Sequence, residues 1–250
     1  MIKTKNFYED LYEKGEYANG EFDLNRLCSI KGLQLWLLRH KTSTINFADI
    51  GCGEGRFLRD FTDTLNQKWN ISINKQLGVD FIKTPENIFE TRKEMEFIQC
   101  DIDGAKLPLA DNSFDLITCN HVLEHIFYTE NLVQEIKRIL KPTGICIISV
   151  PNLSAWINRL FLLFSIQPLG CEMGANSITY GLWLPYFKKH VATLKPAGHI
   201  RNFTPRSLQD ITKEAGFKTV GWWNQDIRLF RITKWAGRGI GIIVVPIESN

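Results

Sequence analysis

The chain has 250 residues, of which 44% are hydrophobic and 23% are charged, and its formal net charge is +3. A chain of this length and composition can bury a full hydrophobic core, and we expect residues 1–250 to form a single domain. The small net charge and the lack of a concentrated Lys/Arg run argue against a nucleic-acid surface, so no nucleic-acid partner is expected.

The 6 cysteines lie far apart in the sequence without metal-ligand spacing, so neither a zinc site nor a disulfide framework is predicted. The N-terminus is charged from Lys3 onward and lacks the apolar region of a secretion signal. The longest apolar stretch, 160–166, is too short to span a bilayer. These features predict a soluble, cytoplasmic protein.

In chain order, an N-terminal helical segment is expected over 1–44, and short β-branched runs then alternate with segments of helical period. A helix carrying Phe57, Leu58 and Phe61 follows the first run. Most runs are apolar on both faces, which is typical of a parallel sheet covered by helices, so the fold class is α/β. Strands are predicted at 45–50, 76–79, 96–100, 114–119, 144–150, 217–223 and 240–246.

Two later helices carry signals for their ends. Thr129 is predicted to cap a helix whose apolar stripe runs to Leu140, and Pro142 with Gly144 is predicted to stop it. Residues 204–216 begin with Thr-Pro and end with Gly, which is the usual asymmetry of a helix.

A glycine-rich turn follows the first predicted strand in the sequence DIGCGEGRF. Gly51, Gly53 and Gly55 can adopt unusual backbone dihedrals and let a ligand approach the main chain at the start of a helix. Arg56 stands where a dinucleotide fingerprint has its third glycine, and no Gly-Lys-Ser/Thr follows, so a nicotinamide or Walker-type site is disfavoured. Asp49 precedes the three glycines in this stretch.

Two further acids end predicted strands and are expected at the same edge of the sheet. Asp80 closes the second strand and Asp101 follows the third. A carboxylate after the second strand commonly accepts ribose hydroxyls, and Asp101 could reach an exocyclic amino group. Each acid alone is an ordinary strand terminator, but together they indicate a nucleoside ligand.

Four stretches follow one another over about 47–152: DIGCGEG, GVD, CDIDGAKLPLADNSFDLITCNHVLEHI and RILKPTGICIISVPN. In this order they resemble the motifs of class I S-adenosylmethionine-dependent methyltransferases. The resemblance implies a Rossmann-like, doubly wound sheet of seven strands, mostly parallel, with an antiparallel last strand and a helical insertion after the fifth. The segment after the sixth strand is the weakest part of the match.

The resemblance also implies roles for residues at the strand ends. Asp49 and the loop from Gly51 to Gly55, with Cys52 and Gly53, would hold the methionine part of S-adenosylmethionine. The ribose hydroxyls would lie at Asp80 with Phe81, the adenine at Asp101 with Ile102, and the sulfonium beside Asn120 and His121.

A general base is optional, because alignment of the reactants supplies most of the rate enhancement in methyl transfer. If the acceptor is a hydroxyl, His121 and His199 are the favoured catalytic residues, and His125 or Tyr180 is a weaker choice. Within VLEHI, His125 is expected to pack and cap, and Glu124 to serve as a local hydrogen-bond partner. No metal ligand is predicted.

Residues 152–201 interrupt the alternation and are predicted to form an insertion, or lid, over the acceptor site. Within it, 153–166 carries apolar residues at helical spacing and only a thin polar side that includes Asn158. A lid helix, a homodimer contact and an interfacial helix in peripheral contact with the membrane remain open interpretations. Aromatic residues that could line the same pocket are Trp183, Tyr186 and Phe187.

Together, these features predict transfer of a methyl group from S-adenosylmethionine to a small-molecule or lipid-linked acceptor, at a hydroxyl oxygen. Transfer to nitrogen or carbon is the alternative within enzymes. A catalytically silent cofactor-binding subunit that regulates a partner is the alternative from another class.

Overall fold

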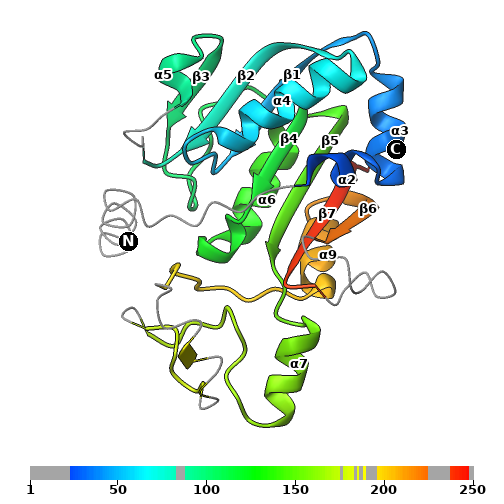
Figure 1. Cartoon of the computed structure of the whole chain (residues 1–250). Helices are drawn as coiled ribbons and strands as arrows, with labels where there is room; N and C mark the ends of the chain where they lie inside the picture. Colours follow the sequence, from blue (N-terminus) through cyan, green and yellow to red (C-terminus); the bar gives the residue numbers. More distant parts are fainter. Residues whose placement is uncertain are drawn as a thin grey trace.

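The computed structural model describes residues 23–82, 88–174, 177–182, 185, 188, 189, 196–224 and 237–247. Its centre is a seven-stranded sheet in the order β3-β2-β1-β4-β5-β7-β6 (Figure 1). Strands β1 to β5 pair in parallel, whereas β7 runs antiparallel to both β5 and β6. The predicted fold class, including the antiparallel last strand, is therefore confirmed.

All seven predicted strands are present, and β2 and β5 begin four residues earlier than expected. The added residues of β2 alternate between exposed and part-buried positions, and those of β5 are mostly exposed or part-buried, so the apolar signal there is weak. The strands are β1 Thr44–Ile50, β2 Ser72–Asp80, β3 Met95–Gln99, β4 Phe114–Asn120, β5 Leu140–Pro151, β6 Phe217–Asn224 and β7 Gly239–Pro246.

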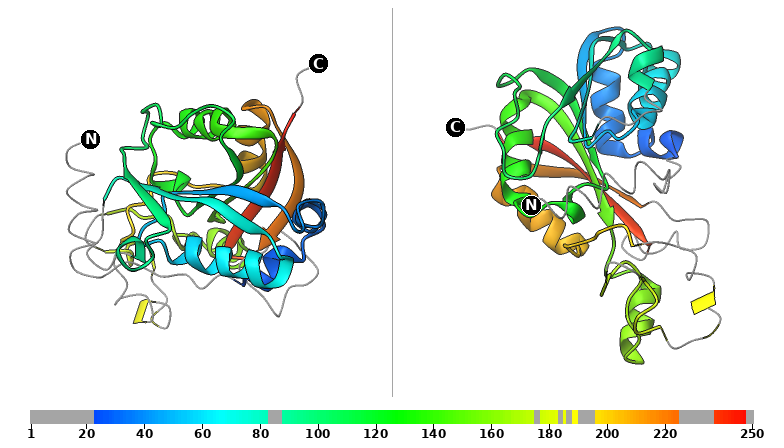
Figure 2. Two further views of the ribbon diagram at one scale, coloured as in Figure 1. Left: turned by 90° about the horizontal axis from the view of Figure 1, so that it is seen from above. Right: turned by 90° about the vertical axis from the view of Figure 1, so that its left-hand side faces the viewer.

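Helices cover both faces of the sheet and bury its apolar side chains (Figure 2). One face packs on α2 (Leu24–Cys28), α3 (Lys31–Arg39) and α4 (Arg56–Trp69), with the short α5 (Ile88–Thr91) at its edge. The other face packs on α6 (Thr129–Ile139) and α9 (Pro205–Glu214). Of the expected N-terminal helical segment, α2 and α3 are helical, and 1–22 lies outside the described residues.

The predicted ends of α6 are wrong, whereas those of α9 are right. Tyr128 occupies the N-cap of α6, and the Thr129 hydroxyl donates to Glu130 instead of capping. The helix ends at Ile139 because the next residue already pairs with β4, so Pro142 and Gly144 lie within β5.

In α9, Thr204 forms the predicted N-terminal cap with Ser207, and Pro205 opens the helix. Gly216 follows its end with a φ of +84°. The sequence therefore predicts the ends of a helix correctly where local capping residues set them, as in α9. It fails where pairing with a neighbouring strand ends the helix, as in α6.

The insertion begins with α7 (Trp156–Leu163), which lies beyond the carboxyl end of β5 (Figure 1). On its inner side, Phe161 packs with Ile166 and Leu182 in a small cluster that is separate from the main core. Asn158, expected on the polar side, is buried, because its amide bonds the backbone of Leu169.

The outer side of α7 leaves several apolar side chains exposed, including Leu163 at 76% and Phe164 at 60%. Among the described residues, no helix is long and apolar enough to cross a membrane. Trp183, Tyr186 and Phe187 lie outside the described residues.

Candidate active site

The predicted cofactor-site residues lie at or just after the carboxyl ends of β1 to β4, at one edge of the sheet. β1 is flanked by β2 on one side and by β4 on the other. The chain adds β2 and β3 on one side of β1 and then crosses over to add β4 and β5 on the other side. Such a switch point opens a crevice beyond the strand ends, which is where open α/β sheets bind ligands.

The glycine-rich turn adopts backbone conformations that L side chains rarely occupy. Gly51, Gly53 and Gly55 have φ values of +74°, +51° and +83°. A Cβ on Gly51 would lie 2.2 Å from Cγ2 of Val122, and one on Gly55 would lie 2.7 Å from the ring of Phe89. The protein's own packing therefore excludes side chains at both ends of the turn, in addition to any need of a ligand.

Asp80 connects this turn to β2. Its carboxylate is buried and accepts hydrogen bonds from the backbone N–H of Gly53 at 2.8 Å and of Phe81 at 2.7 Å, with Ile82 at 3.3 Å. Burial raises the pKa of Asp80, and these backbone donors partly offset that effect. A carboxylate has about four acceptor positions, so capacity remains for a ligand donor.

Asp49 is a second buried carboxylate, at the end of β1. It accepts a hydrogen bond of 2.6 Å from the hydroxyl of Thr118 on β4. Burial raises the pKa of Asp49 to about 7; the bond from Thr118 lowers it, and the charge of Asp80 raises it further. A cationic ligand group beside these two acids would relieve their desolvation and mutual repulsion.

Cys52 is buried within the turn, with its thiol directed at the carbonyl of Gly53 at 3.6 Å. Burial, together with the charges of Asp80 and Asp49, raises the pKa of Cys52 well above its usual value, so the thiol stays neutral.

Asp101 and Ile102 follow β3 and differ in exposure. Asp101 is exposed and accepts a hydrogen bond of 3.0 Å from the backbone N–H of Asp103, as in an Asx turn. Ile102 is buried in the main core. Asp101 therefore has an ordinary local structural role whether or not it also contacts a ligand.

Asn120 ends β4 with a buried, unsatisfied donor. Its Oδ1 accepts a hydrogen bond of 2.8 Å from the hydroxyl of Ser149 on β5, whereas its buried Nδ2 has no hydrogen-bond partner in the part of the chain that the structure describes. Buried amide groups are rarely left unpaired, so this donor is a candidate for ligand contact. Thr118 and Ser149 were not predicted, because their role depends on strand pairing.

His121 follows Asn120 in a left-handed conformation with φ of +55°, which is uncommon outside glycine and clusters at functional sites. Its Nδ1 lies 3.1 Å from Oε1 of Glu124, which is buried. Burial alone would raise the pKa of Glu124, but the hydrogen bond from His121 and the charges of His121 and His125 hold it below its usual value. Glu124 is thus a local hydrogen-bond partner, as predicted.

His199 comes from the end of the insertion and packs against His125, with ring centroids 5.0 Å apart. The backbone N–H groups of Ile200 and Arg201 donate to the carbonyl of Glu124 at 2.9 and 3.0 Å, which fixes this segment beside β4. His121 and His199 are therefore brought to one region through Glu124. Tyr180 is 55% exposed.

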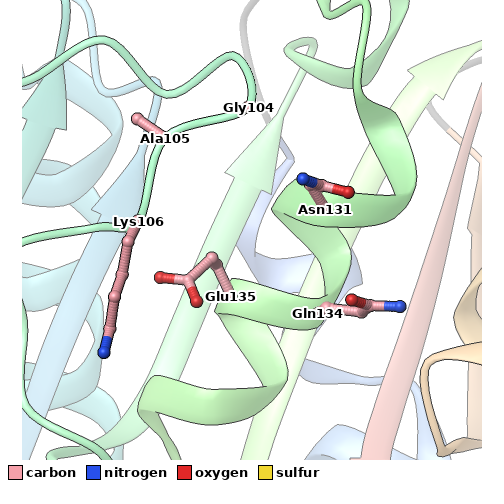
Figure 3. A pocket seen from close by; sticks show the side chains of 6 residues that line it. All are labelled: Gly104, Ala105, Lys106, Asn131, Gln134 and Glu135. Carbon is pink, nitrogen blue, oxygen red and sulfur yellow. The ribbon is translucent and has the colours of Figure 1, made fainter.

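A separate shallow pocket of about 120 Å³ lies between the loop after β3 and α6 (Figure 3). Its lining contains none of the predicted site residues. Five of its six lining residues are exposed to solvent, in contrast to the buried acids at the ends of β1 and β2. The lining residues are Gly104, Ala105, Lys106, Asn131, Gln134 and Glu135.

Comparison with known proteins gives a consistent result. Residues 48–148 match the family described as "Methyltransferase domain". A demethylmenaquinone methyltransferase of Lactococcus lactis is 26% identical over 235 residues, which are 87% of this chain and 85% of that protein. A malonyl-[acyl-carrier protein] O-methyltransferase of Paenibacillus is 27% identical over 129 residues, 49% of this chain and 45% of that protein.

A solved structure with a similar fold is the 1,6-didemethyltoxoflavin-N1-methyltransferase of Burkholderia thailandensis, with bound 1,6-didemethyltoxoflavin and S-adenosylhomocysteine. It aligns with a TM-score of 0.55 at 17% identity, covering 99% of this chain and 88% of that one. The matched domain, the similar methyltransferases and the strand order support a class I S-adenosylmethionine-dependent methyltransferase.

Proposed function

We propose that this enzyme transfers a methyl group from S-adenosylmethionine to a small-molecule or lipid-linked acceptor, at a hydroxyl oxygen. The observation that carries the proposal is the pair of buried carboxylates, Asp49 and Asp80, beside the glycine-rich turn. Asp80 accepts from backbone N–H groups and Asp49 accepts from the hydroxyl of Thr118. Two desolvated acids of this kind fit a ligand that has both hydroxyl donors and positive charge.

In this proposal, each strand end contacts one part of the cofactor. Asp49 and the turn from Gly51 to Gly55, including Cys52 and Gly53, hold the methionine part. Asp80 with Phe81 accepts the ribose hydroxyls, and Asp101 with Ile102 faces the adenine. The unsatisfied Nδ2 of Asn120 supports a contact at the remaining strand end, beside His121.

The bound cofactor supplies a methyl group on a cationic sulfur, and the protein's task is to hold the acceptor in line with the bond that breaks. Alignment of two reactants removes roughly 7–11 kcal/mol of barrier, whereas a general base contributes about 3–5 kcal/mol. Most of the catalysis is therefore expected from positioning by the strand ends and the insertion.

His121 is the proposed general base for a hydroxyl acceptor. Its Nδ1 is held by Glu124, so the imidazole has a fixed orientation and a partner for the positive charge that it gains. His199 is the second candidate for contact with the acceptor, because its segment is bonded to Glu124.

The acceptor is proposed to be apolar or lipid-linked, with residues 152–201 as the lid of its site. Exposed apolar residues on the outer side of α7, including Trp156, Leu163 and Phe164, support a contact with an apolar surface through 153–166. Relatives named for demethylmenaquinone and for malonyl-[acyl-carrier protein] are consistent with such an acceptor. A homodimer contact is the competing role for this side of α7.

One pair of measurements tests the proposal. Titration with S-adenosylmethionine followed by a screen of hydroxylated quinones, phenols and acyl esters should show binding and then turnover with oxygen-methylated product. Methylation at nitrogen or carbon would overturn the assignment of the atom. Binding without turnover on any acceptor would favour a silent partner subunit instead.

A further inference from the structure

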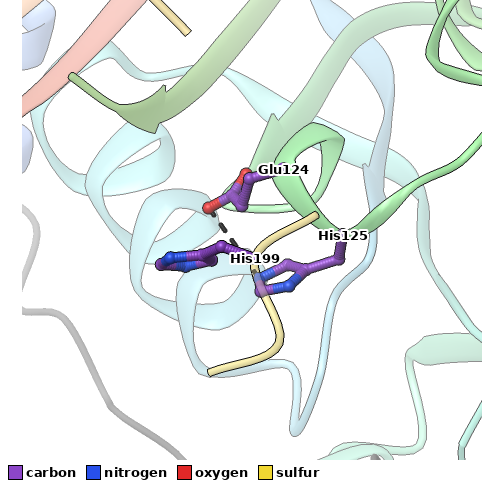
Figure 4. Close-up of side chains that lie close together, drawn as sticks. All are labelled: Glu124, His125 and His199. Atoms are coloured by element: carbon purple, nitrogen blue, oxygen red, sulfur yellow. Dashed lines mark ion pairs between the residues drawn. The ribbon is translucent and has the colours of Figure 1, made fainter. Parts of the chain in front are cut away.

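Three side chains with metal-binding atoms converge where the insertion returns to the sheet (Figure 4). Glu124 and His125 belong to the short 3-10 helix η1 (Leu123–His125), directly after β4, and His199 lies on the passing segment 196–203. Their ligand atoms all lie within 4.8 Å of one another.

Glu124 is the unusual member of this group, because it is only 1% exposed. Its Oε1 lies 3.1 Å from Nδ1 of His121 and 3.9 Å from Nε2 of His125. Its Oε2 is buried and accepts no hydrogen bond from any residue that the structure describes. A buried carboxylate oxygen without a partner is costly, and a cation at this position would remove the cost.

Both imidazoles have outer partners that fix their orientation. Nδ1 of His125 lies 3.3 Å from the carbonyl of Gly198, so the lone pair of the neutral ring is on Nε2, toward Glu124. Nδ1 of His199 lies 3.2 Å from the carbonyl of Gly170 and 3.5 Å from Glu172. Histidines that bind metals typically have a carbonyl or carboxylate partner on the other ring nitrogen.

Glu172 is itself held in place. It accepts hydrogen bonds from the backbone N–H of Ala197 and Gly198, both at 2.8 Å, and of His199 at 3.2 Å. The insertion therefore presents His199 on a bonded turn, and the cluster has an ordered outer shell.

We propose that Glu124, His125 and His199 bind one divalent transition-metal ion of the zinc type and leave coordination positions open for an oxygen of the acceptor. Two imidazoles and one carboxylate are a ligand set that suits zinc or a similar ion better than magnesium. Ligand atoms in a tetrahedral zinc site lie about 3.3 Å apart, so each pair of ligand atoms would approach by at most about 1.5 Å on binding. Metal binding does not depend on the proposed function, but the role in holding an acceptor oxygen does.

The sequence-based expectation of no metal ligand came from the absence of ligand spacing. The proposed ligands come from two distant segments, so local spacing contains no signal for them. An ion here would lie beside His121 and would orient an acceptor hydroxyl and lower its pKa, which are two recognised functions of catalytic metals.

The test is titration of the tag-free, chelator-treated full chain with Co²⁺, whose visible spectrum reports its ligands, followed by displacement with Zn²⁺. We expect one equivalent to bind, with bands typical of nitrogen and oxygen ligands and with thermal stabilisation by Zn²⁺. His125→Gln, His199→Gln and Glu124→Gln should each weaken binding by at least about tenfold. His40→Gln removes a histidine on the opposite face of the sheet and should bind as the wild type does.

Three results would overturn the proposal: no binding by the wild type, wild-type affinity in the histidine variants, or thiolate-to-metal charge transfer that places the ion at a cysteine. Circular dichroism identifies any variant that fails to fold. In that case, hydrogen exchange of the wild type decides the question: Zn²⁺ should protect 121–126 and 196–203 from exchange, and no protection there would overturn the proposal. Turnover after chelation is a separate readout. A chain that binds Co²⁺ at these residues but methylates no acceptor would refute the proposed function and leave the metal site standing.

Discussion

The proposed cofactor side of this molecule and its proposed acceptor side are built differently. The glycine-rich turn donates a hydrogen bond to Asp80, and Asp49 accepts one from Thr118 on β4. The neighbouring residues of β1 and β2 belong to the main core. The acceptor side uses an insertion with its own small cluster around Phe161 and an exposed apolar helix. In the proposed function, the core of the sheet holds the constant ligand, whereas the appended segment contacts the particular acceptor.

The largest expected effect is on the cofactor side. Asp80→Ala removes the acceptor of three backbone hydrogen bonds and the proposed partner of the ribose. Hydrogen bonds to a charged group are worth about 1.5–3 kcal/mol each, so affinity for S-adenosylmethionine should fall by at least about a hundredfold in calorimetry. Asp80→Asn keeps the shape and should lie in between, and unchanged affinity in both variants would refute the assignment of Asp80.

The turn can also be broken sterically. Gly51→Ala combines a φ of +74° with a Cβ that would lie 2.2 Å from Val122, and we expect a loss of about 2–4 kcal/mol of unfolding free energy in urea melts. Gly170→Ala on the insertion is the matched control, because its φ is +87° and nothing lies within 4 Å. Gly170→Ala should lower the unfolding free energy by only about 1 kcal/mol.

A second variant separates strain from the clash. Val122→Ala should destabilise the wild type but recover part of the loss in Gly51→Ala, giving a favourable coupling energy in the double-mutant cycle. Additive effects would mean that packing against Val122 does not explain the glycine at this position.

The buried acids predict a moderate pH effect confined to the cofactor side. The pKa of Asp49 is about 7, and its charged form is favoured by a cationic ligand, so affinity for S-adenosylmethionine should rise roughly tenfold as pH increases from one unit below this pKa to one above. Asp80 is the group whose charge acts on Asp49, and the charge of Asp49 in turn raises the pKa of the Cys52 and Cys119 thiols.

The same shift has a defined sign for stability. The pKa of Asp49 in the folded state lies above its ordinary value of 3.8, so the folded chain retains a proton that the unfolded chain releases between these values. The contribution of Asp49 to stability is therefore present below about pH 4 and is lost as pH rises toward 7. In Asp49→Asn both pH dependences should flatten; a tenfold rise in affinity that persists there would assign the effect to another group.

The smallest effect on the fold is expected on the acceptor side. Leu163→Ser replaces a side chain that is 76% exposed, so unfolding free energy should change by no more than about 0.5 kcal/mol and cofactor affinity should stay constant. Binding to vesicles, or the KM for an apolar acceptor, should weaken. Leu38→Ser, at a 52% exposed position of α3, is the control and should leave both unchanged. An equal response in the two variants would remove α7 from the acceptor site.

The sequence alone determined the strands, the glycine-rich turn and the acids at the strand ends, because each is encoded by a local pattern of apolar runs and backbone-specific residues. Thr204 and Pro205 fixed the start of α9 for the same reason. The tertiary structure decided which of these residues meet. Asn120 bonds Ser149 through strand pairing, His199 reaches Glu124 through a returning loop, and Asn158 turns inward to satisfy the backbone of Leu169. Such contacts join distant segments, and their energy depends on burial and pairing that no local pattern records.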